Sequence, residues 1–237
     1  MNVPQAGPDP NRRPYALSRV TDDANLVESL GRVAIAGHDQ LEHCRAASVT
    51  VIAGGRPTTM GSTDEVAERL DDAQYAADDG PCLAAARHEK SVRIDTVASE
   101  SRWPEFRRVA LELEVSCSLS VPLMMEDPDT FGGLNIYGDL DGGFSRHDEE
   151  LAEAFAAHAA IVVANVVAYW TVLDLSVNLA AAMEHRGVIE QAKGILMATN
   201  GCSPDEAFVR LRQRSQAENR KLRDIAVAIV DDVQGRN

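Results

Sequence analysis

The apolar positions between residues 21 and 140 alternate between helical and strand spacing. A stripe at helical spacing predicts a helix from Thr21 to about Gly37, with an apolar face of Leu26, Val27, Leu30, Val33 and Ala34. The β-branched run at 46–53, the pair Gly54-Gly55 and the run at 56–61 predict a hairpin. Further strands are predicted at 92–95, 115–125 and 132–137, and helices at 64–77 and 103–113. This mixed order predicts an α+β domain with a largely antiparallel sheet.

A long helix is predicted to follow this domain. No proline lies between Pro128 and Pro204, so the chain can stay helical from Arg146 to about residue 199. From residue 172 a 3–4 spacing typical of a coiled-coil seam is seen in two sets, Val172, Leu179, Arg186 and Lys193, and Leu175, Ala182, Ile189 and Leu196. The spacing predicts a parallel homodimer, although packing within a single chain gives a similar pattern.

The last 50 residues contain three helical periods and two stops. Asn200-Gly201 ends the first period, and Ser203 with Glu206 forms a capping box at the start of the second. Asn219 is predicted to cap the third. The predicted apolar faces are Ile189, Ala192, Leu196 and Met197, then Ala207, Phe208 and Leu211, then Leu222, Ile225, Ala226 and Ile229. A compact three-helix unit is therefore expected at the C-terminal end.

Charge is distributed unevenly along the chain. The 237 residues carry a net charge of −14, which is concentrated in residues 1–177. Between Arg186 and Arg223, however, eight Lys or Arg face four Asp or Glu, giving +4. A basic unit on an acidic chain indicates a polyanion partner, and a solvated helix face is the simpler alternative.

Several classes of function find no support in the sequence. The four cysteines are widely spaced, which favours reduced thiols in the cytoplasm over a disulfide framework or a zinc site. No metal site, phosphate-binding loop, nucleophile elbow or dinucleotide fingerprint is found, so no catalytic residue is assigned and no cofactor is named. No run of 18 uncharged apolar residues occurs, so no membrane partner is expected. Residues 1–20 hold four of the ten prolines and are predicted to be a disordered arm.

The C-terminal unit resembles an ANTAR domain. The resemblance rests on Arg186, Ile189 and the run Ala192-Lys193-Gly194-x-Leu196-Met197, on Ala207-Phe208-x-x-Leu211-Arg212, and on Asn219-Arg220-Lys221-Leu222 with Ala226. It implies a helical RNA-binding output module that binds stem-loops in nascent transcripts and suppresses termination. The RNA-contacting residues expected from this pattern are Arg186, Lys193, Arg212, Arg220 and Lys221.

Residues 21–170 resemble a GAF domain of the kind that precedes ANTAR modules in actinobacteria. The strings that carry the resemblance are Asp79-Gly80-Pro81-Cys82, Arg102-Trp103-Pro104-Glu105-Phe106, residues 118–123 and residues 132–137. It implies a sensor domain with a pocket beside the sheet for a small molecule. Residues 171–237 would then hold the coiled-coil helix and the ANTAR domain.

Three residues are candidates for the sensor pocket, each with a simpler alternative. Cys82 could be a redox thiol or a small buried group, and Trp103 could stack on a ligand or cap the domain core. Asn135 could bind a ligand, or occupy an exposed strand position.

The sequence therefore predicts an RNA-binding antitermination regulator with a GAF sensor, acting as a cytoplasmic homodimer and not as an enzyme. The alternatives are a DNA-binding transcription factor with the same sensor and, with less support, a sulfoxide reductase built on a GAF fold.

Overall fold

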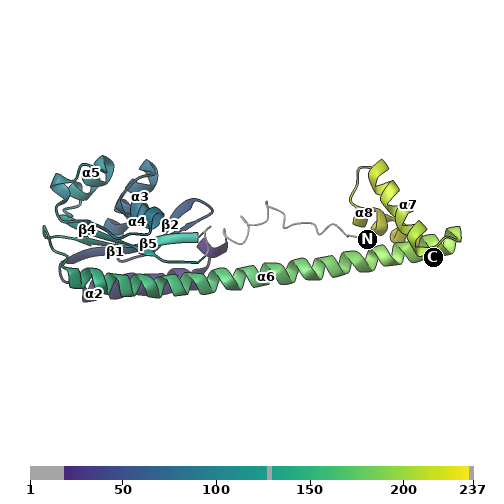
Figure 1. The fold of residues 1–237 in the computed structure, drawn as a ribbon, viewed down its shortest axis with the longest axis horizontal. Helices are drawn as coiled ribbons and strands as arrows, with labels where there is room; N and C mark the ends of the chain where they lie inside the picture. The colour runs from purple at the N-terminus through teal and green to yellow at the C-terminus, as the bar shows by residue number, and fades with distance from the viewer. Residues whose placement is uncertain (1–18, 127–129, 235–237) are drawn as a thin grey trace. The chain divides into compact units, whose positions relative to one another are not determined.

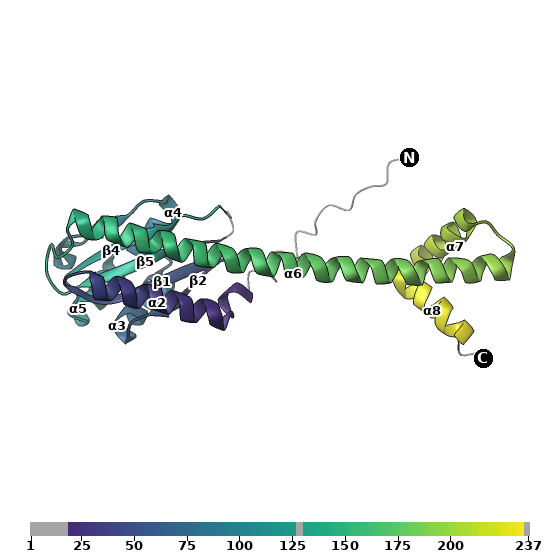
Figure 2. The same cartoon turned by 90° about the horizontal axis from the view of Figure 1, so that it is seen from below.

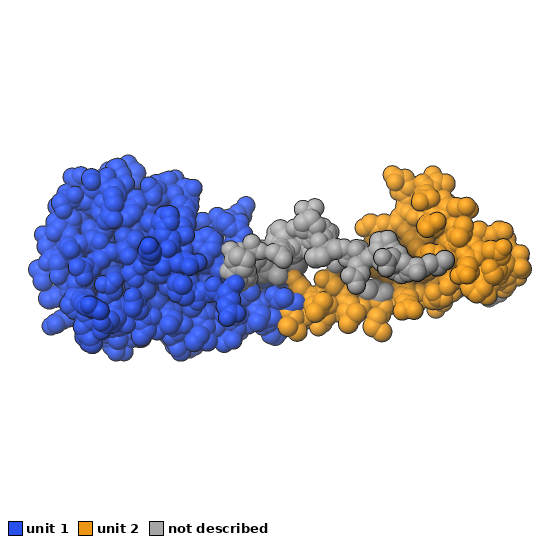
Figure 3. All heavy atoms as spheres, in the orientation of Figure 1, with its two compact units in different colours: residues 1–171 blue, residues 172–237 orange. Residues whose placement is uncertain are grey.

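The structure of the protein is a computed structural model that describes residues 19–126 and 130–234. The chain divides into two compact units, residues 1–171 and residues 172–237 (Figure 3). Residues 19–21 are helical and Val20 is buried. Most of the predicted N-terminal arm, residues 1–18, and the turn predicted around Pro128 lie outside the described residues.

The first unit is built on a five-stranded sheet. Its strands are β1 (Cys44–Ala53), β2 (Arg56–Ser62), β3 (Val92–Ile94), β4 (Cys117–Leu123) and β5 (Thr130–Gly138). The spatial order is β2-β1-β5-β4-β3, and each pair of neighbours is antiparallel. The predicted antiparallel α+β architecture is thus confirmed.

Helices cover both faces of this sheet (Figure 1). Helix α2 (Ala24–Gln40) and the first part of α6 (Arg146–Asn200) lie side by side on one face, as Figure 2 shows from below. Helices α3 (Glu65–Ala77), α4 (Pro81–His88) and α5 (Pro104–Glu112) lie on the other, with a short 3-10 helix at Val97–Ser99. The sequence pattern did not predict α4, which is only eight residues long.

The first predicted helix begins at a different cap. Asp23 caps α2, because its carboxylate accepts hydrogen bonds from the backbone N–H groups of Asn25 at 3.0 Å and Leu26 at 3.1 Å. Thr21, the predicted cap, lies in the helical segment before it. A carboxylate that accepts hydrogen bonds from two backbone N–H groups stabilises the N-terminus of a helix. Val27 is 44% exposed and does not belong to the buried stripe.

The strand period separates an apolar face of the sheet from a polar one. Val49 and Val51 of β1, Leu119 of β4, and Leu134 and Ile136 of β5 pack against α2 and α6 in one core cluster. Because successive side chains of a strand point to opposite faces, the residues between them face α3, α4 and α5. Those intervening residues include several serines and threonines, so the second face is polar.

The second unit contains the end of α6, α7 (Pro204–Ala217) and α8 (Leu222–Gln234). Gly201 has a φ of 61° at the end of α6, and the predicted capping box at the start of α7 is present. Ala192, Leu211, Ile225 and Ala226 form its buried core cluster, and Ala207 of α7 is fully buried as well.

Two predictions for this unit are wrong. Asn219 does not cap α8: its φ is 48°, and its N–H donates to the carbonyl of Gln216, so it ends the turn that follows α7. The carbonyl of Lys221 accepts the first backbone hydrogen bonds of α8, from the N–H groups of Asp224 and Ile225. Phe208 is 40% exposed, because α7 buries only the stripe through Ala207 and Leu211.

The predicted heptad has two environments along α6. Val172, Leu175 and Leu179 are 63%, 67% and 61% exposed, whereas Ile189 and Leu196 pack into the core of the second unit. The side chain of Ala182 lies outside the described residues. The exposed part of the seam is therefore free for another helix, and the coiled coil stays a prediction.

One helical stretch in the described ranges, Arg146–Leu179, is long and apolar enough to cross a membrane, because it contains an 18-residue window with a mean hydropathy of 1.8. Core helices of soluble proteins pass the same test, and Ala152, Ala156 and Val163 of this stretch pack on the sheet.

Candidate functional site

The polar face of the sheet carries buried side chains in rows that follow the strand register. Ser48 of β1, Asn135 of β5 and Ser120 of β4 are cross-strand neighbours, and Tyr137 lies opposite Ser118 in the next row. Helices α3 and α4 add polar groups from above. We call the whole set the polar cluster: Ser48, Thr50, Thr59, Asp71, Gln74, Tyr75, Cys82, Ser118, Ser120, Asn135 and Tyr137.

Asp71 of α3 is the acid of the polar cluster and is fully buried. Its carboxylate accepts hydrogen bonds from the hydroxyls of Tyr137 at 2.7 Å and Thr59 at 2.8 Å, and from the side-chain amide of Asn135 at 3.1 Å. Burial raises the pKa of Asp71 to about 6, and the hydrogen bonds limit that rise. The domain thus keeps a carboxyl group with a strongly shifted pKa in its interior.

Cys82 is held near the N-terminus of α4. Its backbone N–H donates to the Gln74 side-chain oxygen at 2.8 Å, and its thiol donates to the Thr50 hydroxyl at 3.4 Å. Burial, and then the charge of Asp71, raise the pKa of the Cys82 thiol to about 12. The thiol therefore stays protonated and is a poor nucleophile. This position agrees with the buried-group alternative for Cys82.

Three buried oxygens of the polar cluster have no hydrogen-bond partner in the described part of the chain. They are the hydroxyls of Ser118 and Ser120 and the side-chain oxygen of Asn135. Asn135 is fully buried, so the second of its two alternatives, an exposed strand position, is wrong. Buried polar atoms are rarely left unpaired in folded proteins, and an unpaired group costs about 1–3 kcal/mol. The interior of this unit therefore contains three polar atoms whose hydrogen-bonding capacity is unused by the described residues.

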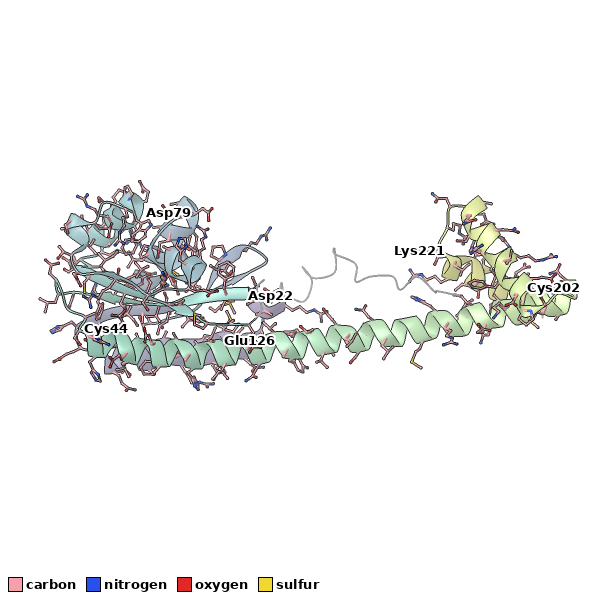
Figure 4. All side chains as sticks on the ribbon, viewed as in Figure 1. Asp22, Cys44, Asp79, Glu126, Cys202 and Lys221 are labelled. Carbon is pink, nitrogen blue, oxygen red and sulfur yellow. The ribbon has the colours of Figure 1, made fainter. Side chains whose placement is uncertain are left out.

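Trp103 closes one side of the domain core. Its indole N–H donates to Asp79 at 2.9 Å, and the Arg102 guanidinium lies 4.3 Å from the ring centroid. Asp79, labelled in Figure 4, stands in the connection between α3 and α4. Between Asp79 and Cys82, Gly80 has a φ of 156°, and a Cβ there would collide with Gln74. The sequence strings around Asp79 and Trp103 therefore form one structure at the edge of the polar cluster.

Sequence reasoning found three members of this region and missed the rest. A signal for Ser48, Thr50, Ser118 and Ser120 was present, since each is a hydroxyl residue at an alternate position of an apolar strand. Nothing in the sequence distinguished Asp71 from the other acids of its helix. Its burial depends on the tertiary packing of α3 against the sheet.

An open groove lies on the opposite, apolar face of the same unit. It has a volume of about 1160 Å³ and runs between α6 and the end of β4. Met124 and Met125 line it on one side, Ala157 and Ile161 on the other, and Glu126 is labelled in Figure 4. In the described ranges, no group of three or more His, Cys, Asp or Glu side chains could hold a metal ion.

The predicted RNA-contacting residues of the second unit differ in how they are paired. Arg186, Arg212 and Lys221 are exposed, and none forms an ion pair with another described residue. Lys193 pairs with Glu190 at 2.9 Å and is only 17% exposed, while Arg220 pairs with Glu218 at 3.0 Å. The first three are therefore the cations most available to a polyanion.

The start of α8 lies next to α6. Arg223 approaches the ring of His185, with 3.0 Å between Nη1 and Nε2. The segment that carries Lys221, labelled in Figure 4, is thus brought toward the part of α6 that carries Arg186. Arg212 lies on α7, on the same side as the exposed ring of Phe208, four residues before it.

Comparison with known proteins identifies both units. A family model described as GAF domain matches residues 25–164, and a family model described as ANTAR domain matches residues 178–230. The chain belongs to the GAF domain family and carries a C-terminal ANTAR domain. It therefore has the architecture of a GAF–ANTAR regulator. A search of curated proteins finds no match.

A solved structure shows the same fold for the first unit, and a second one is similar to it. A domain ascribed to a two-component sensor histidine kinase from Sinorhizobium meliloti is 14% identical over 61% of this chain and 94% of that one, with a TM-score of 0.50. A type II free methionine-R-sulfoxide reductase from Thermoplasma acidophilum is 16% identical over 62% and 96%, with a TM-score of 0.49. At these identities the similarity concerns the fold, and no activity follows from it.

Proposed function

We propose that this protein is an RNA-binding transcription antitermination regulator. Its ANTAR domain binds stem-loops in nascent transcripts, and its GAF domain senses a small molecule or a protein partner. The observation that carries the proposal is the set of exposed cations Arg186, Arg212 and Lys221, which form no ion pair with another described residue, on an ANTAR unit of an otherwise acidic chain. The acidic GAF unit is a poor surface for RNA, so contact is confined to the ANTAR unit.

The cations of this unit have a defined task in RNA binding. Arg and Lys neutralise phosphates and fix the orientation of the RNA, while unpaired loop bases supply sequence specificity. Arg186, Arg212 and Lys221 can do so without breaking an internal ion pair. Lys193 and Arg220 must exchange Glu190 and Glu218 for a phosphate. We therefore rank the first three above the other two.

A DNA-binding function is the second candidate, and one observation favours it. Only residues 218–221 separate α7 from α8, which is the length of connection found in helix-turn-helix modules. No such short turn in an evident recognition register was predicted from the sequence, so the observed connection favours this alternative. Binding of the full chain to a tandem stem-loop RNA and to duplex DNA, at equal salt, distinguishes the two. Tighter binding to the RNA supports antitermination, and tighter binding to the duplex supports the alternative.

The sensing role is supported by the unpartnered oxygens of Ser118, Ser120 and Asn135. A small polar molecule that donates to the Asn135 oxygen and bonds to the two hydroxyls would satisfy all three. Native mass spectrometry of the purified protein tests this role directly. A bound mass that is lost in an Asn135→Leu variant supports it, and an unliganded protein unaffected by metabolite mixtures speaks against it.

The regulator is proposed to act in the cytoplasm as a parallel homodimer. The exposed seam of α6 supports this, since Val172, Leu175 and Leu179 leave a continuous apolar strip in solvent. Such a strip is typical of a helix that pairs with a second helix. The burial and raised pKa of the Cys82 thiol do not support the sulfoxide-reductase alternative.

A further inference from the structure

The ANTAR unit contains a cleft that none of the proposed phosphate-contacting residues Arg186, Arg212 and Lys221 lines. It lies where α6, α7 and α8 meet and has a volume of about 430 Å³. This volume falls within the range of roughly 300–1,000 Å³ that small-molecule pockets occupy. The apolar side chains of Leu196, Leu211 and Ile229 form its floor. The polar side chains of Arg210, Gln213 and Arg214 form its rim.

The α7 side of this cleft follows from helix geometry. Arg210, Gln213, Arg214 and Ala217 stand at positions i, i+3, i+4 and i+7, so they share one side of the helix. Arg212 is two residues from Arg210, which places it about 200° around the helix. Helix α7 therefore has two separate basic sides. The family pattern points to Arg212, whereas the cleft belongs to Arg210 and Arg214.

The charge around the cleft favours an anionic ligand. None of the residues that line it is an acid. Arg214 pairs with Glu218 at 2.6 Å, and Glu206 of the capping box interacts electrostatically with Arg210. Both guanidinium groups still border an apolar floor. This combination fits a flat ring joined to a phosphate, because the floor takes the ring and an arginine takes the phosphate.

The side-chain amides of the rim can recognise the edge of a ring. Gln213 is exposed and makes no side-chain hydrogen bond to a described residue, so it offers both a donor and an acceptor. The Asn200 amide also lines the cleft and already donates to the Leu196 carbonyl at 3.0 Å, which leaves its oxygen as an acceptor. The base edges of single-stranded RNA form hydrogen bonds with such donors and acceptors.

We propose that this cleft receives one unpaired base from the loop of a bound RNA hairpin. The inference rests on the proposed RNA binding and deepens it. The base enters against Leu196, Leu211 and Ile229, Gln213 bonds to its edge, and Arg210 holds the adjoining phosphate. The phosphate-contacting residues Arg186 and Lys221 then fix the hairpin, while the cleft supplies the choice of sequence.

The test uses the full-length protein and a set of hairpin RNAs in a fluorescence anisotropy assay. In each RNA, one loop nucleotide is replaced by an abasic residue. The cleft is filled in an Ala217→Trp variant, which changes no charge, and loses its amide in a Gln213→Ala variant. Arg212→Ala, on the other side of α7, is the matched control. Circular dichroism verifies that every variant is folded.

The inference predicts that one abasic position weakens binding of the wild type by at least about fivefold, which corresponds to the loss of about one hydrogen bond to the base. Ala217→Trp weakens binding of the intact RNA by a similar factor and has no further effect on that abasic RNA. Arg212→Ala weakens binding of both RNAs equally. If folded Ala217→Trp and Gln213→Ala bind every RNA as the wild type does, the cleft is not a base site, although RNA binding stands. If the wild type binds no hairpin, both the inference and the proposed function fail.

Discussion

The indole N–H of Trp103 donates a hydrogen bond to the carboxylate of Asp79 at 2.9 Å, across 24 positions of sequence. This bond ties the start of α5 to the connection between α3 and α4. That connection leads through Gly80 to Cys82, whose N–H is bound by Gln74 inside the polar cluster. Trp103 and Asp79 therefore hold the segment that covers the buried polar face of the sheet.

Removing this bond should destabilise the domain. Trp103→Phe keeps an aromatic ring in the core but cannot donate to Asp79, so we expect a loss of about 1 kcal/mol in the free energy of unfolding. Urea denaturation followed by circular dichroism measures it. Asp79→Asn, whose side-chain oxygen can still accept the indole N–H, is the control and should lose less. Equal stability of Trp103→Phe and wild type would show that the bond contributes nothing.

The buried carboxyl of Asp71 should make stability depend on pH. Its pKa rises from the ordinary value of 3.8 to about 6 in the folded state, so the folded protein binds the proton more tightly than the unfolded chain. This contribution therefore favours folding below pH 4, and is lost as pH rises through 6. The size of the effect is on the order of 3 kcal/mol.

The comparison with Asp71→Asn isolates this contribution from that of other acids. The stability of wild type relative to Asp71→Asn should fall between pH 4 and pH 6 and stay level above about pH 7. Unfolding titrations at several pH values measure the difference. A difference that stays constant over this interval would mean that Asp71 does not titrate as proposed.

Cys82 should react slowly with thiol reagents in the native protein. Its thiol is fully buried, and its pKa is raised to about 12. Cys202, which is partly exposed, serves as an internal reference for labelling by a maleimide. Mass spectrometry of the peptides should find Cys202 labelled well before Cys82. Faster labelling of Cys82 would revive a redox role for this residue.

The exposed seam of α6 should hold the homodimer together. Replacing Leu175 and Leu179 with Glu places charge in an apolar interface, so the double variant should become monomeric at micromolar concentration. Val177→Glu is the matched control, because Val177 is also 60% exposed but lies off the heptad positions. Light scattering gives the masses. A wild type that is already monomeric would refute the predicted dimer.

The sequence predicted most elements of the fold because their signals are local. The alternation in β1, the Gly54-Gly55 turn and the Ser203–Glu206 capping box each depend on a few neighbouring residues. The wrong or missing assignments depend on tertiary packing. Phe208 has the right spacing for a core position, yet α7 is rotated so that its ring is exposed.

The candidate sites show the same division. The sequence did not decide whether Asn135 binds a ligand or is exposed on its strand, and it is buried because three helices cover that face of the sheet. The basic residues of the ANTAR unit could be found from charge and pattern alone. Their pairing could not, because the ion pairs of Lys193 and Arg220 depend on side-chain geometry.

Mutation of single cations in the ANTAR unit should weaken RNA binding by different amounts. Lys221→Ala removes an unpaired cation, while Arg220→Ala removes one that already pairs with Glu218. We expect Lys221→Ala to weaken RNA binding by about 1 kcal/mol and Arg220→Ala to weaken it less. Isothermal titration of each variant with the same hairpin measures the two losses. The opposite order would mean that the Arg220–Glu218 pair opens on binding.

The most direct test of the central proposal is the salt dependence of binding to a tandem stem-loop RNA. Affinity of the full chain should fall linearly on a log–log plot as salt rises, because each phosphate contact releases a condensed counterion. The slope should become shallower in an Arg186→Ala, Lys221→Ala double variant that remains folded, and duplex DNA of equal charge should bind more weakly at every salt concentration. A folded double variant with unchanged affinity and slope, or tighter binding to the duplex, would contradict the assignment of this unit as an RNA-binding module.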